Sequence, residues 1–201
     1  MSKLKQIEPE KLLSTLRGQV GEVIQTYIVM RYFQALSSKL ETTDHLANFK
    51  NQELTINYIV VGKLRDDIIA RLSELSTKKN DRINFNSAVT KFGILRSEFS
   101  VFEDYILSNN FKDRRNKQIS HKELIPKLED ERYYVIKNRT LITAIALSHN
   151  LMMEFDIHHY GPAIKKQWHD MRKRRYDLMV PASVKYMLLP HYMPFDANLR
   201  K

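Results

Sequence analysis

Apolar side chains recur three and four positions apart along much of this chain, which is the spacing of one buried helix face. After a loose lead-in over residues 1–16, with Pro9 at a plausible helix start, this spacing predicts a first helix over 16–40. Its predicted core line is Val20, Val23, Tyr27, Met30, Phe33, Leu36 and Leu40. A second helix is predicted over 51–76, on Leu54, Tyr58, Val61, Leu64, Ile68, Leu72 and Leu75.

The polar residues 77–82 predict a loop, and a third helix follows, from a cap at Asn86 or Ser87 to Asn109. It is carried by Val89, Phe92, Leu95, Phe99, Phe102 and Ile106. A fourth helix is predicted over 130–160, through Val135, Ile142, Ile145, His149, Met152 and Phe155. Gly161 and Pro162 then predict a stop and a restart, followed by a strongly basic fifth helix over 162–176.

Four long helices around one core predict an all-α fold, an antiparallel bundle with the basic fifth helix and an irregular C-terminal extension. We expect the extension to pack on the domain or on a partner, because apolar side chains lie among its prolines. No linker rich in Gly, Ser or Pro divides the chain, so a single domain over 1–201 is predicted. No apolar run reaches the roughly 18 to 20 residues of a membrane span, and the first residues lack a signal peptide's apolar core. A cytoplasmic protein without a membrane contact is expected.

Charge and cysteine content narrow the functional classes. The net charge of +10 favours a polyanionic partner, and RNA and DNA are the common polyanions of a cell. The chain has no Cys, which excludes disulfides, thiolate zinc sites and cysteine catalysis. It also lacks a Gly-rich phosphate loop, so no cofactor is predicted.

One polar stretch over 112–121, between two predicted helices, is dense in Arg, Lys, Asn and His. Cleavage of RNA without a metal needs a group that removes the 2′-hydroxyl proton, and His titrates near working pH. It also needs a fixed cation against the phosphate, where the planar fork of Arg is better suited than Lys. Arg115 and His121 provide these two groups, and the amide of Asn116 is placed to orient the His.

The sequence Arg115-Asn116-Lys117-Gln118-Ile119-Ser120-His121 resembles the motif of the HEPN superfamily, and residues 51–160 resemble its abortive-infection and toxin members. The resemblance implies a metal-independent endoribonuclease with Arg115, Asn116 and His121 as catalytic residues. It makes Arg114 and Lys117 further contacts to RNA phosphates. Six residues on a straight helix turn two side chains about 600° apart, so Arg115 and His121 of one chain would not share a face. They converge only if the helix ends between them or if the sites of two chains meet. The resemblance implies a homodimer whose two motifs line one cleft.

Some members of that group have an antitoxin that modifies a Tyr shortly after the His. Here Lys122, Glu123 and Leu124 follow His121, so an antitoxin partner is an expectation but this form of control is not implied. Two alternatives from other classes stay open. One is a non-catalytic HEPN-like domain that binds RNA, a nucleotide or a protein, and the other is a helical scaffold. In the scaffold, the basic fifth helix and the apolar tail are the interaction surfaces. The structural interpretation of residues 114–121 is a solvated helix end, with Ser120 and Glu123 as a capping box for a short turn.

Three further groups of residues have a functional and a structural interpretation. The basic residues of the predicted fifth helix, with Trp168 and Tyr176 among them, form either an RNA-binding surface or an ordinary charged face; the candidate RNA contacts are Lys165, Lys166, Arg172 and Arg174. His149 lies on an apolar line and is predicted to be a core histidine, with a place in a central cleft as the alternative. Glu154, Asp156, His158 and His159 lack the spacing of a helical zinc site, and no metal site is predicted.

Overall fold

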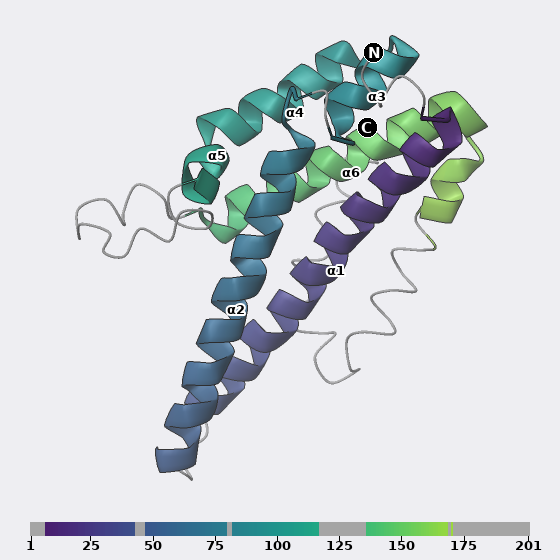
Figure 1. Ribbon diagram of the computed structural model, residues 1–201. Coiled ribbons are helices and arrows are strands. Elements are labelled where there is room, and N and C mark those ends of the chain that lie inside the picture. Colours follow the sequence, from purple (N-terminus) through teal and green to yellow (C-terminus); the bar gives the residue numbers. More distant parts are fainter. Residues whose placement is uncertain (1–6, 43–46, 80–81, 117–135, 169, 171–201) are drawn as a thin grey trace. The chain divides into compact units, whose positions relative to one another are not determined.

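The structure is a computed structural model that describes residues 7–42, 47–79, 82–116, 136–168 and 170, without the side chains of 38–42 and 47–51. Helices connected by short turns make up the described residues, and there is no strand among them (Figure 1). The helices are α1 (Pro9–Thr42), α2 (Ala47–Leu75), α3 (Phe85–Phe92), α4 (Arg96–Ser108), α5 (Phe111–Arg114) and α6 (Asn138–Tyr160). The predicted all-α class is confirmed, whereas the antiparallel bundle and the single domain stay predictions.

Contacts divide the described residues into two compact units. One contains the residues up to Val23 together with Ile69–Trp168, and the other contains Ile24–Ile68. Both α1 and α2 continue from one unit into the other. The residues of the polar motif that the structure describes belong to the first unit, which is therefore the part that positions the candidate site.

The helix α1 begins at Pro9, so the predicted lead-in over 9–16 is wrong. Pro suits this first position because the first helical residues have no partner for their N–H groups. Leu12, Leu13 and Leu16 are buried, which explains why the helix extends this far towards the N-terminus.

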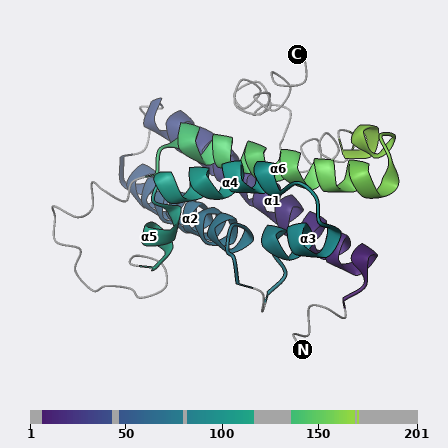
Figure 2. The ribbon, with the colours of Figure 1, turned by 90° about the horizontal axis from the view of Figure 1, so that it is seen from above.

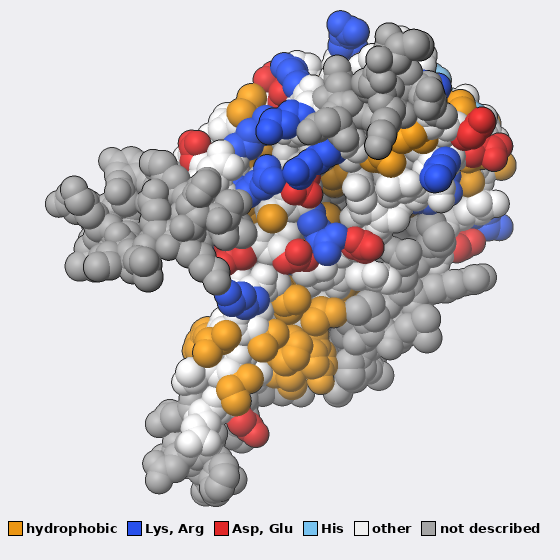
Figure 3. Space-filling model, in the orientation of Figure 1, with side chains coloured by type: hydrophobic (Ala, Val, Ile, Leu, Met, Phe, Trp, Pro, Cys, Tyr) orange, Lys and Arg blue, Asp and Glu red, His pale blue; other side chains and the backbone are white. Residues whose placement is uncertain are grey.

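The C-terminal part of α1 and the N-terminal part of α2 make up the second unit. The predicted core residues Tyr27 and Met30 of α1 are buried. Ile24 and Ile28, next to predicted core positions, are buried as well. The predicted core line of α2 is wrong at Tyr58, whose surface is 57% exposed, while Asn57 beside it is buried. Hydrophobic side chains accordingly gather on the visible surface of this unit (Figure 3).

In the first unit α4 packs against α6, and α3 and α5 each contact α4 (Figure 2). Aromatic rings fill the core between these helices. Phe85 of α3 lies edge-on to Phe102 of α4 at 5.5 Å and is stacked on Phe155 of α6 at 6.3 Å between ring centroids. A buried aromatic side chain removes more apolar surface from water than most others, so this cluster stabilises the arrangement of α3, α4 and α6.

The predicted third helix is broken into α3 and α4, which is a correction to the prediction. Asn84, not Asn86 or Ser87, caps α3: its side-chain oxygen accepts from the Ser87 N–H at 2.9 Å. Gly93 then takes a left-handed conformation with φ 69°, and its N–H donates to the Val89 carbonyl at 2.9 Å, a typical helix end. Leu95 is also left-handed, with φ 58°, and α4 starts after it.

The fourth predicted helix starts later than expected, at Asn138, because residues 136 and 137 are not helical. Its end at Tyr160 is confirmed, and Gly161 follows with φ 86°. A turn at 162–163 leads into helical residues 164–168, so the predicted restart is confirmed. The predicted C-terminal extension lies outside the described residues.

Candidate active site

The first half of the predicted motif lies at the end of α5. Asn110 adopts a left-handed conformation with φ 61°, which ends the run of α4 and starts the short α5. The fully buried Phe111 anchors α5 against the unit. Arg114 and Arg115 follow half-buried, Asn116 is exposed, and the backbone of Arg115 is still helical. Lys117 and His121 lie outside the described residues, so the site shared by Arg115 and His121 stays a prediction.

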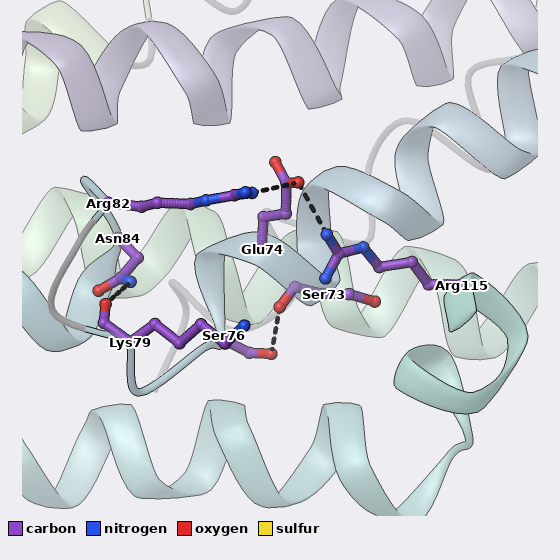
Figure 4. A network of polar contacts seen from close by, with 7 residues as sticks. All are labelled: Ser73, Glu74, Ser76, Lys79, Arg82, Asn84 and Arg115. Carbon is purple, nitrogen blue, oxygen red and sulfur yellow. Dashed lines mark hydrogen bonds and ion pairs between the residues drawn. The ribbon is translucent and has the colours of Figure 1, made fainter. Parts of the chain in front are cut away.

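Arg115 is bound to a carboxylate of α2. Its Nη2 donates to Glu74 Oε1 at 3.0 Å, and the same oxygen accepts from Arg82 Nη1 at 3.3 Å (Figure 4). The Arg115 side chain is 25% exposed, against 48% for Glu74 and 61% for Arg82. We call these three residues the Arg82–Glu74–Arg115 cluster. It brings two guanidinium groups, 33 positions apart in sequence, to one anionic oxygen at the surface.

Part-buried hydrogen bonds hold the described residues between α2 and α3, and one of them reaches the backbone of Arg82. Asn84 Nδ2 donates to the Lys79 carbonyl at 2.8 Å, and Ser87 Oγ donates to the carbonyl of Arg82 at 2.8 Å. At the end of α2, Ser76 Oγ donates to the carbonyl of Ser73 at 3.0 Å. Figure 4 shows the Ser76–Ser73 and Asn84–Lys79 hydrogen bonds beside the ion pairs. The side chains of Glu74 and Arg82 themselves are exposed.

The surface around the Arg82–Glu74–Arg115 cluster carries more positive than negative charge. The Arg82–Glu74–Arg115 cluster has two guanidinium cations and one carboxylate anion. Lys78, in the same loop, pairs with the buried Glu103 at 2.7 Å, and this hydrogen bond raises the pKa of the Lys78 ammonium. Lys and Arg side chains are the more frequent charges on the face seen in Figure 3, with Asp and Glu between them. Such a surface attracts anions and can hold a phosphate oxygen by charge-assisted hydrogen bonds.

Glu74 and Arg82 are functional candidates that the sequence pattern did not indicate. Arg82 belongs to a charged loop, and Glu74 lies on the solvated side of an amphipathic helix. The contacts link residues 8 and 41 positions apart, a distance at which helical spacing carries no information. Only the fold brings these side chains together with the predicted Arg115.

The predicted basic and aromatic surface after Gly161 is only partly described. Lys165 and Lys166 are exposed, as an RNA contact would need, while Arg172 and Arg174 lie outside the described residues. The expectation that Trp168 belongs to this surface is wrong. Trp168 is 4% exposed, and its indole N–H donates to Asp156 Oδ2 at 2.5 Å. A buried indole N–H needs such a partner, and this one turns the ring inwards.

Asp156 is fully buried and holds together three separate segments of the first unit. Besides Trp168 it accepts from Arg17 of α1, from Nε at 2.9 Å and from Nη2 at 2.8 Å. This pairing, chiefly the hydrogen bond, raises the pKa of the Arg17 guanidinium. The Arg17 guanidinium also lies 5.5 Å from the ring centroid of Tyr160. Asp156 is therefore committed to a structural ion pair.

His149 is buried on α6, as predicted for a core histidine, and its ring lies edge-on to Trp168, with 5.1 Å between the ring centroids.

Across the part of the chain that the structure describes, no group of three or more His, Asp or Glu side chains is arranged to hold a metal ion. No described helix is both long and apolar enough to cross a membrane.

Comparisons of this chain with protein-family models, with curated protein sequences and with solved structures found no match.

Proposed function

We propose that this chain is a HEPN-type, metal-independent endoribonuclease of the toxin or phage-defence kind. It acts in the cytoplasm as a homodimer whose two chains form one RNA-cleaving site. The observation that carries the proposal is the sequence Arg115-Asn116-x4-His121 in a strongly basic, all-helical chain. The partly exposed guanidinium of Arg115, bound to a surface carboxylate and not to the core, supports a role towards an anionic ligand.

In the proposed reaction His121 removes the proton of a ribose 2′-hydroxyl, and the 2′-oxygen attacks the adjacent phosphorus. The bond from phosphorus to the 5′-oxygen breaks, and that oxygen takes a proton from the second His of the dimer. The products are a 2′,3′-cyclic phosphate and a 5′-hydroxyl. Arg115 stabilises the extra negative charge on the phosphate, and Asn116 orients the His or donates to a phosphate oxygen.

The remaining cations are assigned to RNA binding. Arg114 and Lys117 flank the catalytic residues in sequence, and the exposed Lys165 and Lys166 begin the second basic stretch, which Arg172 and Arg174 continue. Because such cations contact the sugar–phosphate backbone of the RNA, they contribute affinity and salt dependence but do not select an RNA sequence. An antitoxin protein is a further proposed partner, as expected of a toxin.

The proposal is tested by RNA cleavage in the presence of a chelator. The parent should cut, Arg115→Ala should lower the rate about 100-fold or more, and His121→Ala at least as much. Two control variants should keep the parent's rate. Arg71→Ala removes another ion-paired Arg, and His158→Ala removes an exposed His outside the motif. Equal rates in all variants would sink the proposed site.

A second function follows from the cluster itself. Two guanidinium groups that converge on one anionic oxygen are suited to phosphate binding whether or not a bond is cut. In that case the chain is a non-catalytic, HEPN-like RNA-binding domain. It would bind RNA with the affinity of the parent after His121→Ala and would show no chelator-resistant cleavage.

A further inference from the structure

We propose that Arg82 is a second phosphate-binding residue beside Arg115, and that Glu74 is an internal anion that an RNA phosphodiester displaces. This inference rests on the proposed function, because it assigns a partner to the surface around Arg115. It adds two residues, from a different part of the chain, to the predicted motif.

The geometry is the first argument. Arg115 Nη2 and Arg82 Nη1 donate to the same oxygen, Glu74 Oε1, at 3.0 and 3.3 Å. A phosphate oxygen is an anionic acceptor of the same kind, and Arg forks bind phosphate and carboxylate with the same hydrogen-bond geometry. The Glu74 oxygen therefore marks the position where both guanidinium groups would meet one phosphate.

The charges give the second argument. One carboxylate neutralises only one of the two cations, so the cluster keeps a positive charge that favours an anionic ligand. A phosphodiester that enters must break two exposed ion pairs, and exposed pairs of this type contribute only about 0 to 1 kcal/mol each. The side chains can therefore exchange partners at a small free-energy cost.

The loop gives the third argument. The hydrogen bond from Ser87 Oγ to the Arg82 carbonyl holds the backbone of Arg82 against the start of α3. The Arg82 side chain itself is the most exposed of the three. A backbone held in this way, with an exposed cation, suits a phosphate contact, because little backbone freedom is lost on binding.

Binding of a labelled single-stranded 2′-O-methyl RNA, measured by fluorescence anisotropy in a chelator, tests the inference. This probe has no free 2′-hydroxyl, so binding is read separately from cleavage. Glu74→Gln should bind about fivefold tighter than the parent. Arg82→Gln should bind about fivefold weaker, with the slope of log affinity against log salt reduced by about 1. The double variant Glu74→Gln/Arg82→Gln should lose the gain.

The ion pair of Arg71 with Glu22 provides matched controls, since both are exposed charges of the same types. Glu22→Gln and Arg71→Gln should each change affinity less than about twofold. Circular dichroism checks the fold of each variant, and the gain from Glu74→Gln cannot come from unfolding. Equal effects of Glu74→Gln and Glu22→Gln, or of Arg82→Gln and Arg71→Gln, would overturn the inference. If the binding differences appear but the parent does not cut RNA, the endoribonuclease proposal fails and this one stands.

Discussion

The buried carboxylate of Asp156 should contribute strongly to the stability of the first unit. Asp156→Asn keeps the shape of the side chain but removes the charge that Arg17 and Trp168 share. The new amide has one oxygen in place of two, so it cannot accept both bonds of Arg17 and the bond of Trp168. Its NH₂ group would also face one of these donors.

The expected cost follows from burial. Asp156 is fully buried, and loss of one partner from a buried ion pair costs about 3–5 kcal/mol. The Arg17 side chain is 27% exposed, so water recovers part of its solvation and the lower half of this range applies. The Trp168 N–H, buried with no carboxylate to accept it, adds about 1 kcal/mol. We expect a total loss of about 4–5 kcal/mol in the free energy of unfolding.

Urea unfolding followed by tryptophan fluorescence measures this loss, because Trp168 is the chain's single Trp and lies at the site itself. Glu22→Gln is the matched control: it breaks an exposed Arg–carboxylate pair and should cost no more than about 1 kcal/mol. If Asp156→Asn and Glu22→Gln lose the same small amount, the structural role given to Asp156 is refuted.

Two further predictions concern titration and backbone conformation. Burial raises the pKa of Tyr27 to about 12 from 10.0, so the folded state keeps this proton longer than the unfolded state. Stability should therefore fall as pH rises from 10 to 12, by about 2–3 kcal/mol more in the parent than in Tyr27→Phe, in urea titrations at each pH. Gly93→Ala should destabilise by about 1 kcal/mol because φ is 69°, whereas Gly18→Ala inside α1 should stabilise by up to about 1 kcal/mol, since no neighbour lies within 4 Å. Thermal unfolding of the two Ala variants compares them, and shifts of the same sign would contradict the account.

Hydrophobic spacing predicted the helices well where one face is continuously buried. The buried positions Ile68, Leu72 and Leu75 of α2 and Ile145, Met152 and Phe155 of α6 follow that spacing. The same spacing hid the break between α3 and α4, because Phe92, Leu95 and Phe99 keep the period across it. Gly93 alone is a weak signal for a helix end, and nothing in the sequence marks Leu95 for a left-handed conformation.

The site was predictable only where neighbours in sequence carry the chemistry. Arg115 and Asn116 were found as parts of a local motif. Glu74 and Arg82 come from other segments, and only the fold of the first unit brings them together with Arg115. The prediction that Trp168 lies on the surface was wrong for the same reason. Its basic neighbours suggested an exposed ring, whereas Asp156, twelve positions earlier, draws the indole into the core.

The chemical ends of cleaved RNA are the most direct test of the proposed metal-independent endoribonuclease activity. Single-stranded RNA is incubated with the parent and with His121→Ala in a chelator, and the products are analysed by mass spectrometry. The proposed reaction predicts fragments with a 2′,3′-cyclic phosphate and a 5′-hydroxyl from the parent. His121→Ala should give a yield at least about 100-fold lower. Fragments with 5′-phosphate ends, or the same yield from both proteins, would contradict it.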